Sequence, residues 1–77
     1  MGTSSTKLVY GVGTRVRFIK DYMSEDGWVI SAGALGVIIR ILPRVAVLLD
    51  ERGPEEEEIV ALMSNFILSE QLERLPD

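Results

Sequence analysis

The chain carries few of the side chains that perform covalent or metal-based chemistry. Its 77 residues include no cysteine and no histidine, which excludes disulfides, thiolate or imidazole metal sites, and catalysis by either side chain. The hydroxyl groups of Thr14, Ser64 and Ser69 have no plausible general base beside them. We therefore expect a protein that is not an enzyme and needs no metal or cofactor. The alternative is an active site formed between subunits.

Carboxylates are the most abundant groups that could bind a cation or transfer a proton. Four consecutive glutamates occupy positions 55–58, directly after the turn-forming pair Gly53-Pro54. A calcium loop needs alternating ligands and a turn glycine, and acid–base catalysis needs a pocket that shifts one pKa. The run has neither feature, so we interpret it as a solvated hairpin tip that prevents edge aggregation. Contact with a basic partner is the alternative.

Two glycines, Gly33 and Gly36, lead into the apolar stretch "VIIRIL". Their spacing matches neither a P-loop nor a dinucleotide-binding fingerprint, and no predicted helix follows to present its N-terminus to a phosphate. We predict a backbone role instead, in which glycine permits a positive φ or a sharp bend where a loop enters a curled strand.

Charge and hydropathy limit the partners. The net charge is −4, from 8 basic and 12 acidic residues, which disfavours binding driven by phosphate neutralisation. The longest apolar run is broken by Arg40 and is too short to cross a membrane, and no secretory signal precedes it. We expect a cytoplasmic protein without membrane contact. Nucleic-acid contact remains the alternative if four arginines form a basic strip: Arg15, Arg17, Arg40 and Arg44.

The hydrophobic pattern predicts short strands joined by turns. Residues 15–18 alternate strictly, with Val16 and Phe18 on the core face. A long loop follows, and further strands are predicted at residues 34–42, 44–50 and 58–64. Residues 69–72 suit one helical turn, with a final strand at residues 73–75 as the competing interpretation. Residues 1–7 are expected to be a flexible leader and residues 8–77 a single domain.

Four stretches carry a resemblance to a known fold: "VGTRVRFI", "GALGVIIRI", "RVAVLLDE" and "NFILSEQLERL". Their order resembles the SH3-like barrels of bacterial electron-transport accessory proteins, and the "GxxGxV" strand is similar to KOW-type domains. The resemblance implies an all-β fold, namely a small five-stranded SH3-like barrel with a long loop after the first strand and a short helical turn near the C-terminus. It implies an accessory or protein-binding role, or a nucleic-acid-associated role for a KOW-like module.

Three of the predicted strands are apolar on both faces. With Val37, Ile39 and Ile41 turned inward, the opposite faces would leave a contiguous exposed patch, which monomers rarely tolerate. We therefore expect a protein partner or self-association. The alternatives are that residues 7–10 and the C-terminal turn cover the patch, and that Trp28 plugs the barrel end. Long-loop side chains complete the predicted partner-binding set: Tyr22, Met23, Trp28, Ile38, Leu42, Leu48, Val60 and Leu62.

Overall fold

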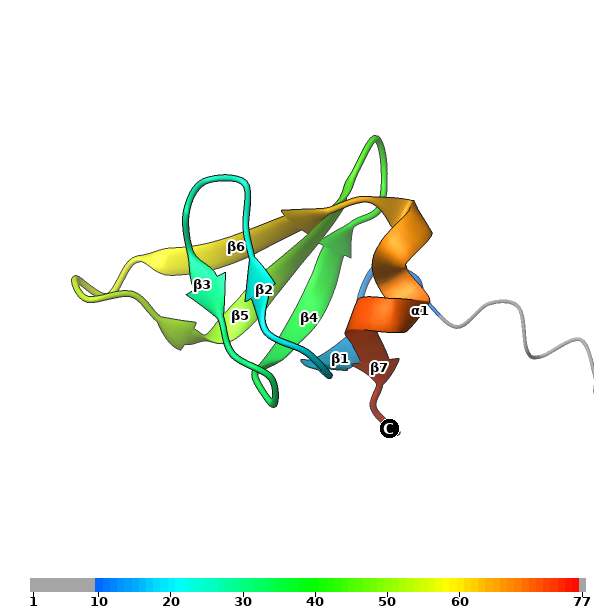
Figure 1. Cartoon of the computed structure of the whole chain (residues 1–77), viewed down its shortest axis with the longest axis horizontal. Coiled ribbons are helices and arrows are strands. Elements are labelled where there is room, and N and C mark those ends of the chain that lie inside the picture. Colours follow the sequence, from blue (N-terminus) through cyan, green and yellow to red (C-terminus); the bar gives the residue numbers. More distant parts are fainter. Residues whose placement is uncertain (1–9, 77) are drawn as a thin grey trace, which may run out of the picture.

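The described part of the chain forms one five-stranded antiparallel sheet and one two-stranded ribbon (Figure 1). The computed structural model describes residues 10–76, so the leader expected at residues 1–7 lies outside it. The sheet has the order β6-β5-β4-β1-β7. Its strands are β1 (Arg15–Phe18), β4 (Leu35–Arg40), β5 (Val45–Arg52), β6 (Glu58–Met63) and β7 (Leu72–Arg74), and the ribbon pairs β2 (Tyr22–Met23) with β3 (Val29–Ile30).

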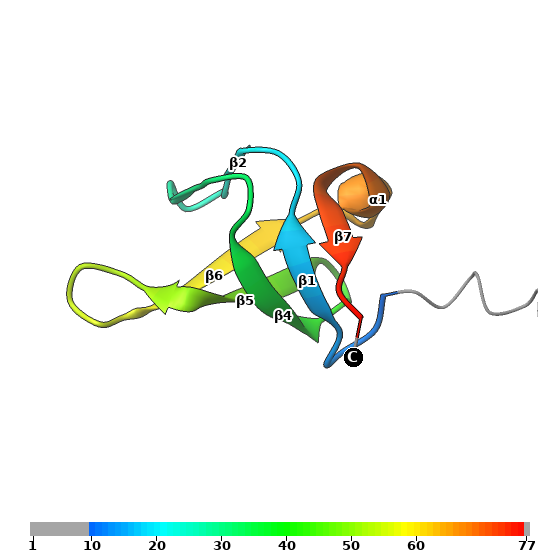
Figure 2. The same cartoon turned by 90° about the horizontal axis from the view of Figure 1, so that it is seen from below.

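A small, mostly β fold is confirmed, but the prediction of a closed barrel with five strands is wrong. Residues 10–76 contain seven strands, and β6 and β7 are the two edges of an open sheet. The long loop contributes the two extra strands, because a turn at Gly27, where φ is 99°, lets Tyr22 pair with Ile30. The ribbon and the helical segment cover one side of the sheet (Figure 2), so the core is enclosed without a closing strand pair.

The core lies between this covered side of the sheet and the segments above it. Alternation turns one side chain in two inward, as in β1, where Val16 and Phe18 are buried and the two arginines are exposed. Burial of each large apolar side chain contributes roughly 2 kcal/mol. The largest fully buried side chains are Val16, Phe18, Ile38, Val45, Val47, Met63 and Leu72.

A short helical segment leads from β6 to β7. A 3-10 turn, η2 (Asn65–Ile67), continues into α1 (Leu68–Gln71). The Ser64 hydroxyl accepts a hydrogen bond from the Phe66 N–H at 3.1 Å and so caps the turn. Ile67 and Leu68 pack against the core, and buried Gln71 donates to the Lys20 carbonyl at 2.8 Å. The expected helical turn and the competing final strand therefore both occur.

Gly33 has the predicted positive φ, whereas Gly36 has a different backbone role. Gly33 has a φ of 95°, a conformation that other residues rarely adopt. A Cβ atom on Gly36 would lie 2.7 Å from the Leu48 carbonyl oxygen, so only glycine permits this approach of β4 to β5.

The facing predicted for the second strand is wrong at Val37 and Ile39, whereas Ile41 packs against the core as predicted. Ile38 is 0% exposed in the core, whereas Ile39 is 44% exposed. Strict alternation from the charged Arg40 would turn Ile38 outward. The pairing of β4 with β5 shifts between Ile38 and Arg40, however, so Ile39 and Arg40 both reach the surface.

Candidate functional site

The outer face of the sheet, opposite the ribbon and the helix, carries a continuous apolar row. Val37 of β4 pairs with Leu48 of β5, and Leu48 pairs with Val60 of β6. Leu62 extends the apolar surface because it lies two residues beyond Val60 on the same strand face. All four side chains are half-buried, so they line a shallow apolar surface. Val37, Leu48 and Val60 are called the outer row below.

An ion pair borders the outer row. The Arg15 guanidinium donates to both carboxylate oxygens of Asp50, at 2.8 and 2.7 Å. Arg15 lies on β1 and Asp50 on β5, so the pair spans the intervening β4. These hydrogen bonds lower the pKa of Asp50 and raise the pKa of Arg15. The pair therefore keeps its charges and fixes the position of both side chains beside Val37.

The ribbon offers a second exposed apolar surface. Met23 and Val29 are directly paired and are 68% and 66% exposed. Their neighbour Tyr22 turns inward, where its ring centroid lies 6.1 Å from that of Phe18 and its hydroxyl donates to the Leu62 carbonyl at 2.6 Å. Burial raises the pKa of Tyr22. This anchored tyrosine holds the ribbon against β6, with Met23 and Val29 facing outward.

The residues predicted to bind a partner do not form one surface. Leu48, Val60 and Leu62 lie together on the outer face, whereas the long-loop residues lie on the segment that covers the other face. Trp28 is half-buried against the core, and Leu42 is exposed in the connection between β4 and β5. Ile38 lies in the core, so it cannot contact a partner directly.

Phe66 is an exposed aromatic residue that the sequence interpretation missed. Its side chain is 93% exposed on the capped turn η2. A single helical turn can direct only part of the stretch "NFIL" toward the core, and Ile67 and Leu68 take that position. Phe66 is the apolar residue of this stretch that is left over, and the predicted helical turn at residues 69–72 did not include it.

Three of the four arginines predicted to form a basic strip make ion pairs with carboxylates of the described residues. Arg15 pairs with Asp50, Arg17 with Glu73, and Arg44 with Glu25. Arg40, on the same sheet, makes no ion pair within residues 10–76. The strip is therefore largely neutralised by its own neighbours.

The described residues contain neither a metal-binding cluster nor a membrane-spanning helix. Within residues 10–76, no three potential metal-ligating side chains are grouped closely enough to hold an ion. Neither η2 nor α1 is long and apolar enough to cross a bilayer. The chain matches no protein-family model, curated protein or solved structure with which it was compared.

Proposed function

We propose that this protein is a non-enzymatic SH3-like accessory module that binds another protein through the outer face of its sheet. The order of elements supports the SH3-like assignment. A long segment with its own ribbon follows β1, and a helical turn precedes the last strand of the sheet. This is the arrangement that the sequence resemblance implies, built on an open sheet.

The outer row is the observation that carries the proposal. Three strands contribute apolar side chains in register to the face that neither the ribbon nor the helical segment covers. Such a stripe is what a protein partner buries, because removing apolar surface from water contributes about 25 cal/mol per Å². The ribbon residues Met23 and Val29 add a separate contact surface on the other side.

The test places a charge at the centre of the row. In an affinity-capture experiment, wild type should retain a partner and Leu48→Glu should not. The control is Val12→Glu, which introduces the same charge at an exposed apolar site outside the row. This control should retain the partner as wild type does. Sedimentation velocity on the same proteins identifies self-association as the alternative source of the partner. Equal retention of the partner by all three proteins would contradict the proposal. A wild-type protein that is a monomer and retains no partner would also contradict it.

Charge argues against the alternative of a KOW-like nucleic-acid module. Arginines contribute to phosphate binding when they are free to neutralise phosphates, and three of the four already lie beside carboxylates. We therefore favour a protein partner over a nucleic acid.

A further inference from the structure

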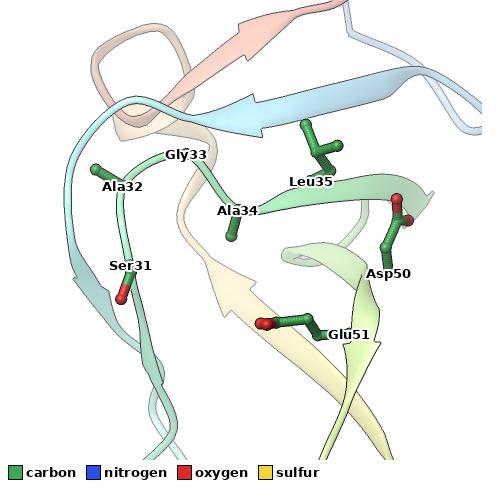
Figure 3. Close-up of a pocket in the computed structure, with 7 residues that line it drawn as sticks. All are labelled: Ser31, Ala32, Gly33, Ala34, Leu35, Asp50 and Glu51. Carbon is green, nitrogen blue, oxygen red and sulfur yellow. The ribbon is translucent and has the colours of Figure 1, made fainter.

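A pocket of about 400 Å³ opens where β5 extends past the start of β4 (Figure 3). One wall is the turn that runs from Ser31 to Leu35, and the other is the end of β5 at Asp50 and Glu51. Gly33, whose φ is 95°, lies within the turn that forms the first wall. The volume is sufficient for one long side chain.

Three backbone N–H donors of the turn are already used. The Ala32 N–H donates to the Asp21 carboxylate, the Gly33 N–H to the Phe18 carbonyl, and the Ala34 N–H to the Ser31 carbonyl. An anion would need such donors, and these are occupied. What the pocket offers besides is the Ser31 hydroxyl, which can accept as well as donate, and the carboxylates of β5, which only accept.

The two carboxylates of the pocket differ in whether they form an ion pair. Asp50 is held by both nitrogens of Arg15, so its charge is balanced. Glu51 forms no ion pair within residues 10–76, and its side chain extends from β5 toward the segment that carries Ser31 (Figure 3). Glu51 is thus the unbalanced charge of the pocket, and the acidic hairpin at residues 55–58 strengthens the negative potential around it.

The rest of the lining is aliphatic. Ala34 and the partly exposed Leu35 flank the acceptors. An apolar wall beside one carboxylate and one hydroxyl matches a methylene stem that ends in a cation, since such side chains pack their stems on apolar surface and hydrogen-bond with the charged end.

We propose that this pocket binds the cationic side chain, lysine or arginine, of the partner protein. This inference rests on the proposed function and specifies the chemistry of the partner. Leu35 and Asp50 belong to the strands that carry the outer row, whereas Glu51 points toward the Ser31 segment on the ribbon side (Figure 3). A partner on the outer row therefore reaches the pocket with a basic residue that extends around the end of β5. Affinity for one isolated side chain is expected on the order of 1 mM, because a single ion pair near solvent contributes little.

The experiment is an NMR titration of the full chain with Nα-acetyl-lysine N-methylamide. Saturable shifts are expected at the amides of residues 31–35 and 51. The uncharged norleucine analogue should not produce them. Glu51→Gln should weaken binding at least fivefold, and Ser31→Ala should weaken it less. Glu55→Gln removes the same charge from the neighbouring acidic hairpin, outside the pocket, and should leave the affinity within twofold.

Three results would overturn the proposal: equal shifts with norleucine, equal weakening by Glu51→Gln and Glu55→Gln, or no shift at the pocket. A parallel titration with 1,4-diaminobutane tests whether the pocket prefers a free amine to the side chain of a polypeptide. Tighter binding of the diamine than of the lysine derivative would overturn the assignment to a protein partner. Loss of partner retention in Leu48→Glu is measured separately, so failure of the pocket and failure of the proposed function remain distinguishable.

Discussion

Gly36 lies at the closest approach of β4 to β5. A Cβ atom there would meet the Leu48 carbonyl oxygen at 2.7 Å and the Val47 Cγ1 atom at 2.9 Å. The first of these atoms is backbone, which cannot move without disturbing the strand pairing. Glycine is therefore required at this position because it has no Cβ atom.

Gly36→Ala is expected to lower the free energy of unfolding by about 1–3 kcal/mol, the usual cost of overpacking a core. Urea denaturation measures the change. Gly11→Ala is the matched control, because no atom lies within 4 Å of a Cβ placed there. Equal stability of the two variants would show that β4 can shift away from β5.

Asp50 gives the protein a predictable response to acid. The hydrogen bonds from Arg15 lower its pKa in the folded state, so the pair's contribution to stability is present above the unfolded-state pKa of about 3.9 and is lost as the pH falls through the folded-state value. The stability advantage of wild type over Asp50→Asn should shrink on acidification from about pH 5 to about pH 2. Urea unfolding at each pH measures it.

Both partners of this pair are more than 40% exposed, at 43% and 45% of their side chains, so the effect should be small and should weaken further in high salt. A difference between the two proteins that stays constant or grows toward low pH would contradict the assignment.

Each edge strand of the sheet is fastened by a tyrosine. The Tyr22 hydroxyl donates to the Leu62 carbonyl of β6, and the Tyr10 hydroxyl donates to the Leu72 carbonyl of β7 at 2.9 Å. The ribbon has only two paired positions, which alone would be marginal in water. Its attachment through Tyr22 therefore matters more than its own pairing.

Tyr22→Phe should destabilise the protein by about 1 kcal/mol, the net value of one partly buried hydrogen bond. The more specific readout is hydrogen exchange at the Ser24 amide, which donates to the Trp28 carbonyl within the ribbon. Its exchange should accelerate in Tyr22→Phe and not in Tyr10→Phe. Identical exchange in both variants would mean that the ribbon is held by packing alone.

The alternation of apolar and polar residues predicted the strands correctly where it was regular. Arg15 to Phe18 alternate in the sequence and in the structure, and Val45, Val47 and Leu49 face inward as expected. It failed at β4, because the bulge after Ile38 leaves no mark in residue type. It also missed the ribbon, whose strands of two residues each are too short to show a period.

The candidate site was only partly predictable for a similar reason. Leu48, Val60 and Leu62 follow from the apolar excess of their strands, whereas the exposure of Phe66 depends on a 3-10 turn at residues 65–67 that the sequence did not indicate. The pocket at Glu51 could not be found this way, because it exists only where Ser31 and β5, twenty residues apart in the sequence, meet in space.

Negative charge gathers at one end of the long hairpin formed by β5 and β6. Glutamates 55–57 lie in its tip, which projects beyond the rest of the sheet (Figure 1), and Glu58 begins β6. At the other end Arg44 precedes β5 and is paired with Glu25. With a net charge of −4, the molecule as a whole repels polyanions. The electrostatic field of the molecule thus favours basic partners over nucleic acids.

A gel-shift assay tests this at the scale of the molecule. No shift of a short duplex DNA or a single-stranded RNA is expected, even at roughly 50 mM salt, where phosphate contacts are strongest. A complex that weakens steeply with added salt, and weakens again in Arg40→Ala, would reverse our preference for a protein partner.

The pairing of β1 with β7 also sets the order in which the molecule assembles. Val16 pairs with Arg74, 58 positions away, whereas β4, β5 and β6 are joined by short turns. Local hairpins close quickly and distant pairings slowly, so the three-strand meander should form before β7 arrives. Until then β1 has one unpaired side, and the outer row already exists. Newly made or partly unfolded chains would therefore be most prone to associate wrongly in that interval, with β1 as the point of entry.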